Sequence, residues 1–116
     1  MSDLKQLDSD LNNMILGGQA LEAFEKYYAD GVVMQENGEA PRVGKDINRK
    51  YEEQFFGSMK EFHNAELRAS AVGDGVSFSE WMFDVTFQDG NRVQIEQALR
   101  RTWKGDKVTH ERFYHP

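Results

Sequence analysis

ADGVVMQENG, residues 29–38, is a short apolar strand that ends in a lone carboxylate, and the rest of the fold can be placed around it. It lies between an amphipathic helix that ends near Tyr28 and another helix that begins near Asp46. A carboxylate at the end of a strand beneath helices is in a low-dielectric environment, which suits a general base. Glu36 is therefore the first candidate for chemistry. The alternative is a solvated Glu36 that only terminates the strand.

Helical periodicity flanks this strand on both sides. Apolar residues recur every three to four positions from Leu4 to Ile15 and again from Ala20 to Tyr28, with two glycines between the runs. A third run of this kind extends from Ile47 to Met59. The sequence therefore predicts a helix pair before the strand and a third helix after it.

From Phe62 onward the apolar period changes to two, which is typical of strands. Glycine-containing turns at 73–75, 89–91 and 104–106 divide this part into four strands. Two of them, Val76–Phe87 and Arg92–Trp103, have about twelve residues each, which is longer than usual and forces a sheet to curl. The predicted fold class is α+β, with three helices packed on a strongly curved, mainly antiparallel sheet that forms a cone with a pocket.

Composition limits the possible functions. The 116 residues suit one domain, residues 1–116, and the hydrophobic and charged fractions of 39% and 29% are those of a soluble globular chain. A net charge of −6 repels phosphates, so no nucleic-acid partner is expected. Cysteine is absent, and the three histidines have no metal-ligand spacing, so we expect neither a metal nor a cofactor. No apolar leader or membrane-length apolar run is present, which predicts a cytoplasmic protein without membrane contact.

The order of elements and three short motifs carry a family resemblance. Tyr28-Ala29-Asp30 precedes the buried strand, Pro41-Arg42-Val43-Gly44 precedes the third helix, and GDKVTHERFY, residues 105–114, closes the chain. In this order the chain resembles the SnoaL-like branch of the nuclear transport factor two-like superfamily, and it is similar to ketosteroid isomerase. The resemblance implies a cystatin-like roll. The superfamily contains isomerases, cyclases, epoxide hydrolases, dehydratases and non-catalytic binding modules, so the fold is implied more firmly than the activity.

The resemblance also implies roles for single residues. Glu36 falls where ketosteroid isomerase has its catalytic aspartate base. The isomerase pairs that base with an oxyanion hole made of a tyrosine and a protonated aspartate. These two positions correspond roughly to Asn12 and Leu99, so the oxyanion hole does not match.

If the strand faces follow the family, further polar groups enter the pocket. Asp84 and Glu111 then join Glu36 as candidate catalytic carboxylates, and their crowding keeps a proton on at least one of them. Arg101 beside Glu111 is similar to the arginine flanked by acids of the superfamily's epoxide hydrolases. The predicted substrate-binding residues are Asn12, Tyr28, Tyr51, Phe55, Met82, Ile95, Gln97, Leu99, Arg101, Trp103, Phe113 and His115.

The strand that contains Asp84 allows two interpretations. Simple alternation makes Asp84 part of a solvated face. The family instead places the opposite, aromatic face against a partner subunit, which predicts a homodimer through the outer face of the sheet. That face would consist of Trp81, Phe83, Val85, Phe87, Val108 and Tyr114.

Two function classes remain open. One is a cofactor-free enzyme of the isomerase, cyclase or hydrolase type that acts on a small apolar or aromatic molecule, with Glu36 as general base. The other is a non-catalytic ligand-binding module with the same pocket. An enzyme needs a donor near the atom that Glu36 approaches, whereas a binding module can leave Glu36 solvated or paired with Arg42.

Overall fold

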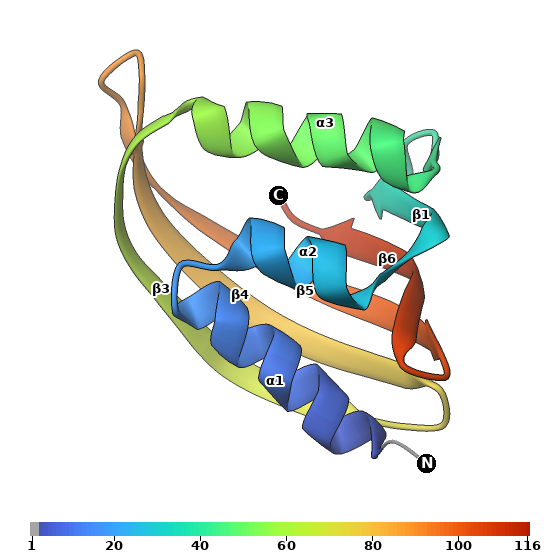
Figure 1. The fold of residues 1–116 in the computed structure, drawn as a ribbon. Coiled ribbons are helices and arrows are strands. Elements are labelled where there is room, and N and C mark those ends of the chain that lie inside the picture. The colour runs from blue at the N-terminus through green and yellow to red at the C-terminus, as the bar shows by residue number, and fades with distance from the viewer. Residues whose placement is uncertain (1–2) are drawn as a thin grey trace.

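The computed structural model describes residues 3–116, which form three helices on the concave side of a six-stranded sheet (Figure 1). The helices are α1 (Leu4–Leu16), α2 (Ala20–Tyr27) and α3 (Lys45–Gly57). The strands are β1 (Tyr28–Glu36), β2 (Arg42–Val43), β3 (Met59–Val72), β4 (Val76–Phe87), β5 (Arg92–Lys104) and β6 (Lys107–Tyr114).

The sheet has the order β2-β1-β6-β5-β4-β3, with β1 parallel to β6 and every other neighbouring pair antiparallel. The long strands β3, β4 and β5 curve around α1 and α2, while α3 runs from the β1–β2 edge of the sheet to the start of β3 (Figure 1). The predicted α+β class, with helices on a curved and mainly antiparallel sheet, is confirmed.

Local sequence explains the helix pair. The Asp3 carboxylate caps α1 by accepting a hydrogen bond of 3.0 Å from the backbone N–H of Lys5. Gly18 has a φ of 80°, a left-handed conformation that glycine adopts without strain. The chain can therefore turn directly from α1 into α2, and the apolar faces of both helices point toward the sheet.

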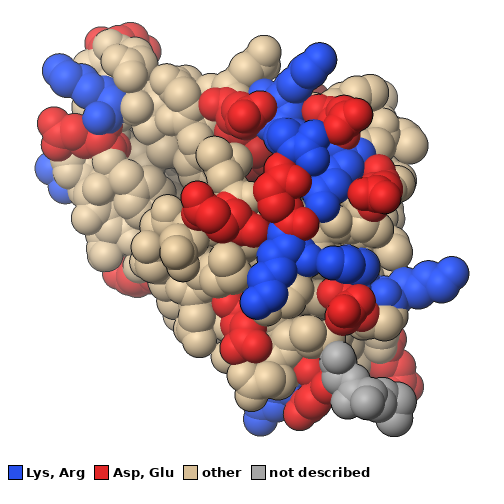
Figure 2. Space-filling view, in the orientation of Figure 1, with Lys and Arg blue, Asp and Glu red and all other residues tan. Residues whose placement is uncertain are grey.

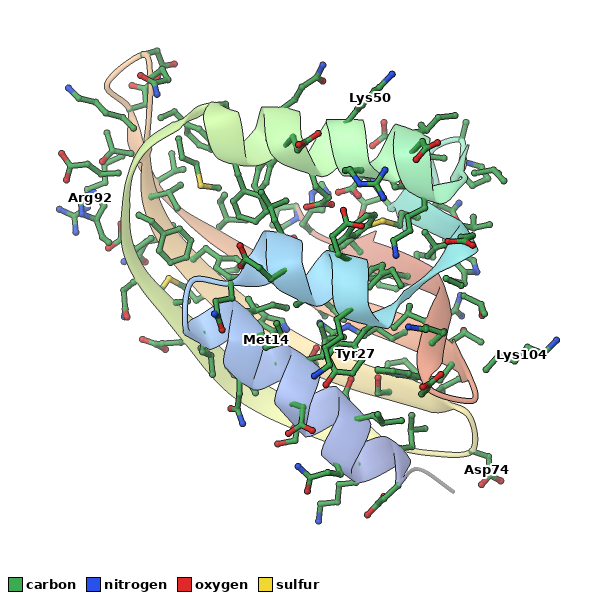
Figure 3. The ribbon with its side chains drawn as sticks, in the orientation of Figure 1. Met14, Tyr27, Lys50, Asp74, Arg92 and Lys104 are labelled. Carbon is green, nitrogen blue, oxygen red and sulfur yellow. The ribbon has the colours of Figure 1, made fainter. Side chains whose placement is uncertain are left out.

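The core lies between the helices and the middle of the sheet, where side chains fill the space (Figure 3). Leu11 of α1 and Phe24 of α2 pack there against β1 and β6. Tyr27 and Trp103 meet edge to face, with ring centroids 6.2 Å apart. The remaining buried members of this cluster are Ala23, Tyr28, Val32, Met34 and Val108.

The register of β4 with β5 corrects one prediction about strand faces. Trp81 lies opposite Gln97 and Phe83 lies opposite Ile95, and residues directly opposite each other share a face of the sheet. Trp81 is fully buried on the concave side. The prediction that Met82 and Asp84 point into the cone is therefore wrong, because the pleat turns them to the convex side.

The same register overturns the predicted dimer surface. Trp81, Val85 and Val108 each have an exposed fraction of 0% within one chain, so they belong to the interior and not to an outer apolar patch. Of the residues in that predicted set, Tyr114 remains exposed. The oligomeric state itself stays a prediction.

The visible face of the molecule in Figure 2 has acidic and basic side chains interleaved over α2 and α3. Glu25 of α2 pairs there with Lys45 and Arg49 of α3, which joins the two helices at the surface. Such exposed pairs contribute little to stability, typically below about 1 kcal/mol. Within residues 3–116, no helix has the length and apolar character needed to cross a membrane.

Candidate functional site

A cavity of about 700 Å³ lies between the concave face of the sheet and the three helices. Its size is within the range of small-molecule sites, and its walls are mostly apolar. Aromatic rings come from helices α2 and α3 and from the four strands β1, β3, β4 and β6. They are Phe24, Tyr28, Tyr51, Phe55, Phe56, Phe62, Trp81, Phe83 and Phe113.

Arg101 of β5 is the centre of a buried polar network at the wall of this cavity. Its side chain is inaccessible to solvent. Nε donates to Glu111 Oε2 at 2.8 Å, and Nη1 donates to Asp8 Oδ1 at 2.9 Å and to Asn12 Oδ1 at 2.6 Å. Nη2 is buried and has no partner among residues 3–116. One guanidinium N–H₂ group is therefore left without an acceptor.

Further hydrogen bonds fix the two carboxylates of this network. Tyr28 Oη donates to Glu111 Oε2 at 2.6 Å. Ser77 Oγ donates to Asp8 Oδ1 at 2.7 Å, and Trp103 Nε1 donates to Ser77 Oγ at 3.0 Å. Burial and the nearby charge of Glu111 raise the pKa of Tyr28 well above its usual range. The phenol thus remains a donor, and the network ties α1 firmly to the sheet.

Glu36 ends β1 at the edge of the cavity, but it is not free. Arg42 Nη2 donates to Glu36 Oε2 at 3.1 Å, and His115 Nε2 lies 3.3 Å from Glu36 Oε1. Arg42 also stacks over the Tyr51 ring at 3.6 Å and donates from Nε to Asn48 Oδ1 at 3.2 Å. The ion pair is therefore held from both sides, which is the arrangement expected for a binding module.

Glu52 of α3 is a cavity residue that the sequence analysis missed. Burial raises the pKa of Glu52 to about 8, with further upward contributions from Glu111 and Glu36 and an opposing one from Arg42. No hydrogen bond contributes to this shift. At neutral pH the cavity consequently contains a protonated carboxyl group. A signal existed in the sequence, because Glu52 lies one helical turn after the buried Asn48 on the inward face of α3.

Most predicted site residues do reach the cavity. Asn12 and Trp103 instead lie behind its wall, in the network around Arg101. Within residues 3–116, no group of three or more histidine or acidic side chains is arranged to hold a metal ion. The predicted residues that line the cavity are Tyr28, Glu36, Tyr51, Phe55, Ile95, Gln97, Leu99, Arg101, Glu111, Phe113 and His115.

Asp84 is the predicted catalytic carboxylate that the structure removes from the site. It accepts two hydrogen bonds of 3.0 Å from Arg92, which projects outward at the end of the β4–β5 hairpin (Figure 3). The hydrogen bonds and charge of Arg92 lower the pKa of Asp84. A catalytic role for Asp84 is therefore wrong, and so is a substrate contact by Met82. Trp81 and Phe83 take the corresponding places in the cavity wall.

No family model and no curated protein sequence matches the chain. Solved structures with the same fold do match it. A Mesorhizobium loti protein, provisionally described as a SnoaL-like polyketide cyclase, matches with a TM-score of 0.86 and 27% identity over 98% of this chain and 100% of its own. The fold is SnoaL-like. Other neighbours are nuclear transport factor two-like proteins of unknown function.

Two more distant neighbours show the range of this SnoaL-like fold. A Catenulispora acidiphila protein with a ketosteroid isomerase-like fold, in complex with trimethylamine, has a TM-score of 0.73 and 10% identity over 88% of this chain and 79% of its own. AclR from Streptomyces galilaeus, provisionally described as a hydroxylase, has a TM-score of 0.78 and 12% identity over 97% and 87%. The predicted resemblance is confirmed, and the neighbours are compatible with an enzyme without fixing its reaction.

Proposed function

We propose that this SnoaL-like protein binds a small, largely apolar molecule in the cavity and acts on it by proton transfer, as a cofactor-free enzyme of the isomerase, cyclase or hydrolase type. The observation that carries the proposal is the carboxyl group of Glu52, which faces a mostly apolar cavity beside the Tyr28–Glu111–Arg101 network. Glu52 is partly buried and makes no ion pair among residues 3–116, and such a carboxyl group is costly unless it serves a ligand or a reaction.

Glu36 and Glu52 can divide the acid and base roles because their surroundings differ. Glu36 is ion-paired with Arg42 and is the candidate base, whereas Glu52 carries a proton at neutral pH and is the candidate acid. Two carboxyl groups in unlike environments are the usual basis for such a division. Behind the same wall, Arg101 adds a positive charge that is shared with the Asp8 and Glu111 carboxylates.

The non-catalytic binding module is the second candidate, and one observation favours it. The 3.1 Å ion pair between Glu36 and Arg42 occupies the group that would act as base. Under this alternative the same cavity holds its ligand, and neither carboxyl group moves a proton.

A deuterium-exchange experiment tests catalysis against binding. The protein would be incubated in D₂O with a panel of apolar carbon acids and epoxides, and exchange and hydrolysis would be followed by NMR. Glu36→Gln and Glu52→Gln should each lower the rate by roughly 10²–10⁴-fold, the range for a lost general acid or base. Asp84→Asn is the matched control, because Asp84 lies outside the cavity and should not affect the rate. Unchanged rates in both glutamine variants would refute the enzymatic proposal.

We also infer that two copies associate through the convex face of the sheet. Phe78 and Tyr114 are 50% and 42% exposed there, and neither belongs to the core cluster. Sedimentation of the wild-type protein should show a dimer at micromolar concentration, and Phe78→Ser should weaken it. A wild-type monomer would refute this association.

A further inference from the structure

The charges around the cavity are not balanced. Five carboxyl groups contribute to its lining, from Glu22, Glu36, Glu52, Glu61 and Glu111, whereas Lys60 and Arg101 are the two cationic side chains of that lining. Glu22 and Glu61 are exposed and screened by solvent, so the negative potential that attracts cations comes from the less exposed Glu36, Glu52 and Glu111.

The partners of these groups show where the imbalance lies. Arg101 already contacts two carboxylates, Asp8 and Glu111, and Glu36 is paired with Arg42. Among residues 3–116, Glu52 makes no ion pair. A partly buried carboxylate needs a cation or a proton to offset its lost hydration.

We infer that the cavity takes an apolar molecule carrying a cationic nitrogen, an amine or a quaternary ammonium group, with Glu52 as its counter-ion and the aromatic walls as its cage. This inference rests on the proposed function of the cavity as a ligand site, and with such a ligand bound Glu52 is ionised and no longer serves as the acid. Aromatic faces attract ammonium groups, and this attraction is strongest where water is excluded. Phe55 contributes to the wall and is 37% exposed, so its ring is open to such a contact.

Other ligand charges fit these surroundings less well. A carboxylate ligand would enter the field of Glu36 and Glu111, with Arg101 already neutralised. A neutral ligand would leave Glu52 to hold its own proton.

The inference requires a particular pH dependence. The pKa of Glu52 is about 8 in the free protein. Below that pH a permanently charged ligand must displace a proton from Glu52, so its Kd should fall about tenfold for each unit that the pH rises and should level off above pH 8. A neutral ligand of the same shape should not show this dependence.

Calorimetry with a matched pair of probes tests the inference. Benzyltrimethylammonium and neopentylbenzene have nearly the same shape and differ by one charge. The cation should bind the wild-type protein at least about tenfold more tightly at pH 8, which corresponds to 1.4 kcal/mol. Glu52→Gln should abolish both the preference and the pH dependence, whereas Asp84→Asn should leave them intact.

The outcomes separate this inference from the proposed function. Equal or tighter binding of neopentylbenzene or of phenylpropionate would overturn the cationic ligand while leaving a ligand site in place. Binding of none of the three probes would overturn both proposals. If the Glu52 variant does not fold, the pH dependence of the Kd of benzyltrimethylammonium for the wild-type protein still tests whether Glu52 is the counter-ion.

Discussion

Replacing Arg101 by methionine should destabilise the protein strongly. The substitution leaves the carboxylates of Asp8 and Glu111 buried without their cation, since both accept hydrogen bonds from the guanidinium. Removal of one partner from a buried ion pair typically costs about 3–5 kcal/mol, because the remaining charge is left uncompensated. Here one cation serves two carboxylates and Asn12, so we expect a loss of at least about 3 kcal/mol.

Urea unfolding at neutral pH, followed by circular dichroism, measures this loss. Arg92→Met is a matched control, because Arg92 also belongs to β5 and makes two hydrogen bonds to a carboxylate. The side chain of Arg92 is 61% exposed, compared with 1% for Arg101. Its replacement should cost less than about 1 kcal/mol. Similar losses for the two variants would refute the view that burial makes the Arg101 network structurally important.

Two further predictions concern the same cavity. Tyr28→Phe removes the 2.6 Å hydrogen bond to Glu111 and should lower the free energy of unfolding by about 1–3 kcal/mol. Tyr114→Phe on the convex face is the control and should change this free energy little. Equal effects of the two substitutions in urea titrations would argue against the Tyr28–Glu111 contact. The folded pKa of Glu52 is raised from 4.5 to about 8, so its contribution to stability is complete below pH 4.5 and is lost as the pH rises through 8. Glu52→Gln should remove this part of the pH dependence. Unfolding of both proteins at pH 5 and pH 8 measures it, and a glutamine variant whose free energy of unfolding changes with pH as much as that of the wild type would contradict the prediction.

Much of the fold follows from short-range patterns in the sequence. The change from a helical to a two-residue period at Phe62 and the three glycine-containing turns placed the long strands correctly, since both signals act over a few residues. The inward faces of β5 and β6 were also predicted, with Gln97, Leu99 and Phe113 in the cavity wall.

The face of β4 was predicted wrongly because two arguments disagreed. Strict alternation favours Trp81 and Phe83 on one face, and that simple pattern agrees with the structure. The family resemblance favours the opposite assignment of the two faces. Since side chains alternate along a strand, a shift of one residue exchanges the two faces completely, and Met82 and Asp84 were moved into the cone by that error.

The polar network depends on contacts that a linear pattern does not reveal. Asp8 and Arg101 are 93 positions apart, and Tyr28 and Glu111 are 83 apart. Within the described part of the chain, residues 3–116, Glu52 makes no hydrogen bond that would distinguish it from the other acidic residues of α3. Its importance emerges only when the cavity and the neighbouring carboxylates are assembled around it.

Titration of the Glu52 carboxyl carbon by NMR would show whether this group carries a proton at neutral pH. The resonance would be assigned by its disappearance in Glu52→Gln and followed from pH 4 to pH 10 in the protein without ligand. The structure predicts a midpoint near pH 8, so that Glu52 carries its proton at neutral pH. A midpoint close to 4.5, the ordinary value for glutamate, would show that the carboxyl group is solvated and would remove the basis for both its acid role and its role as a ligand's counter-ion.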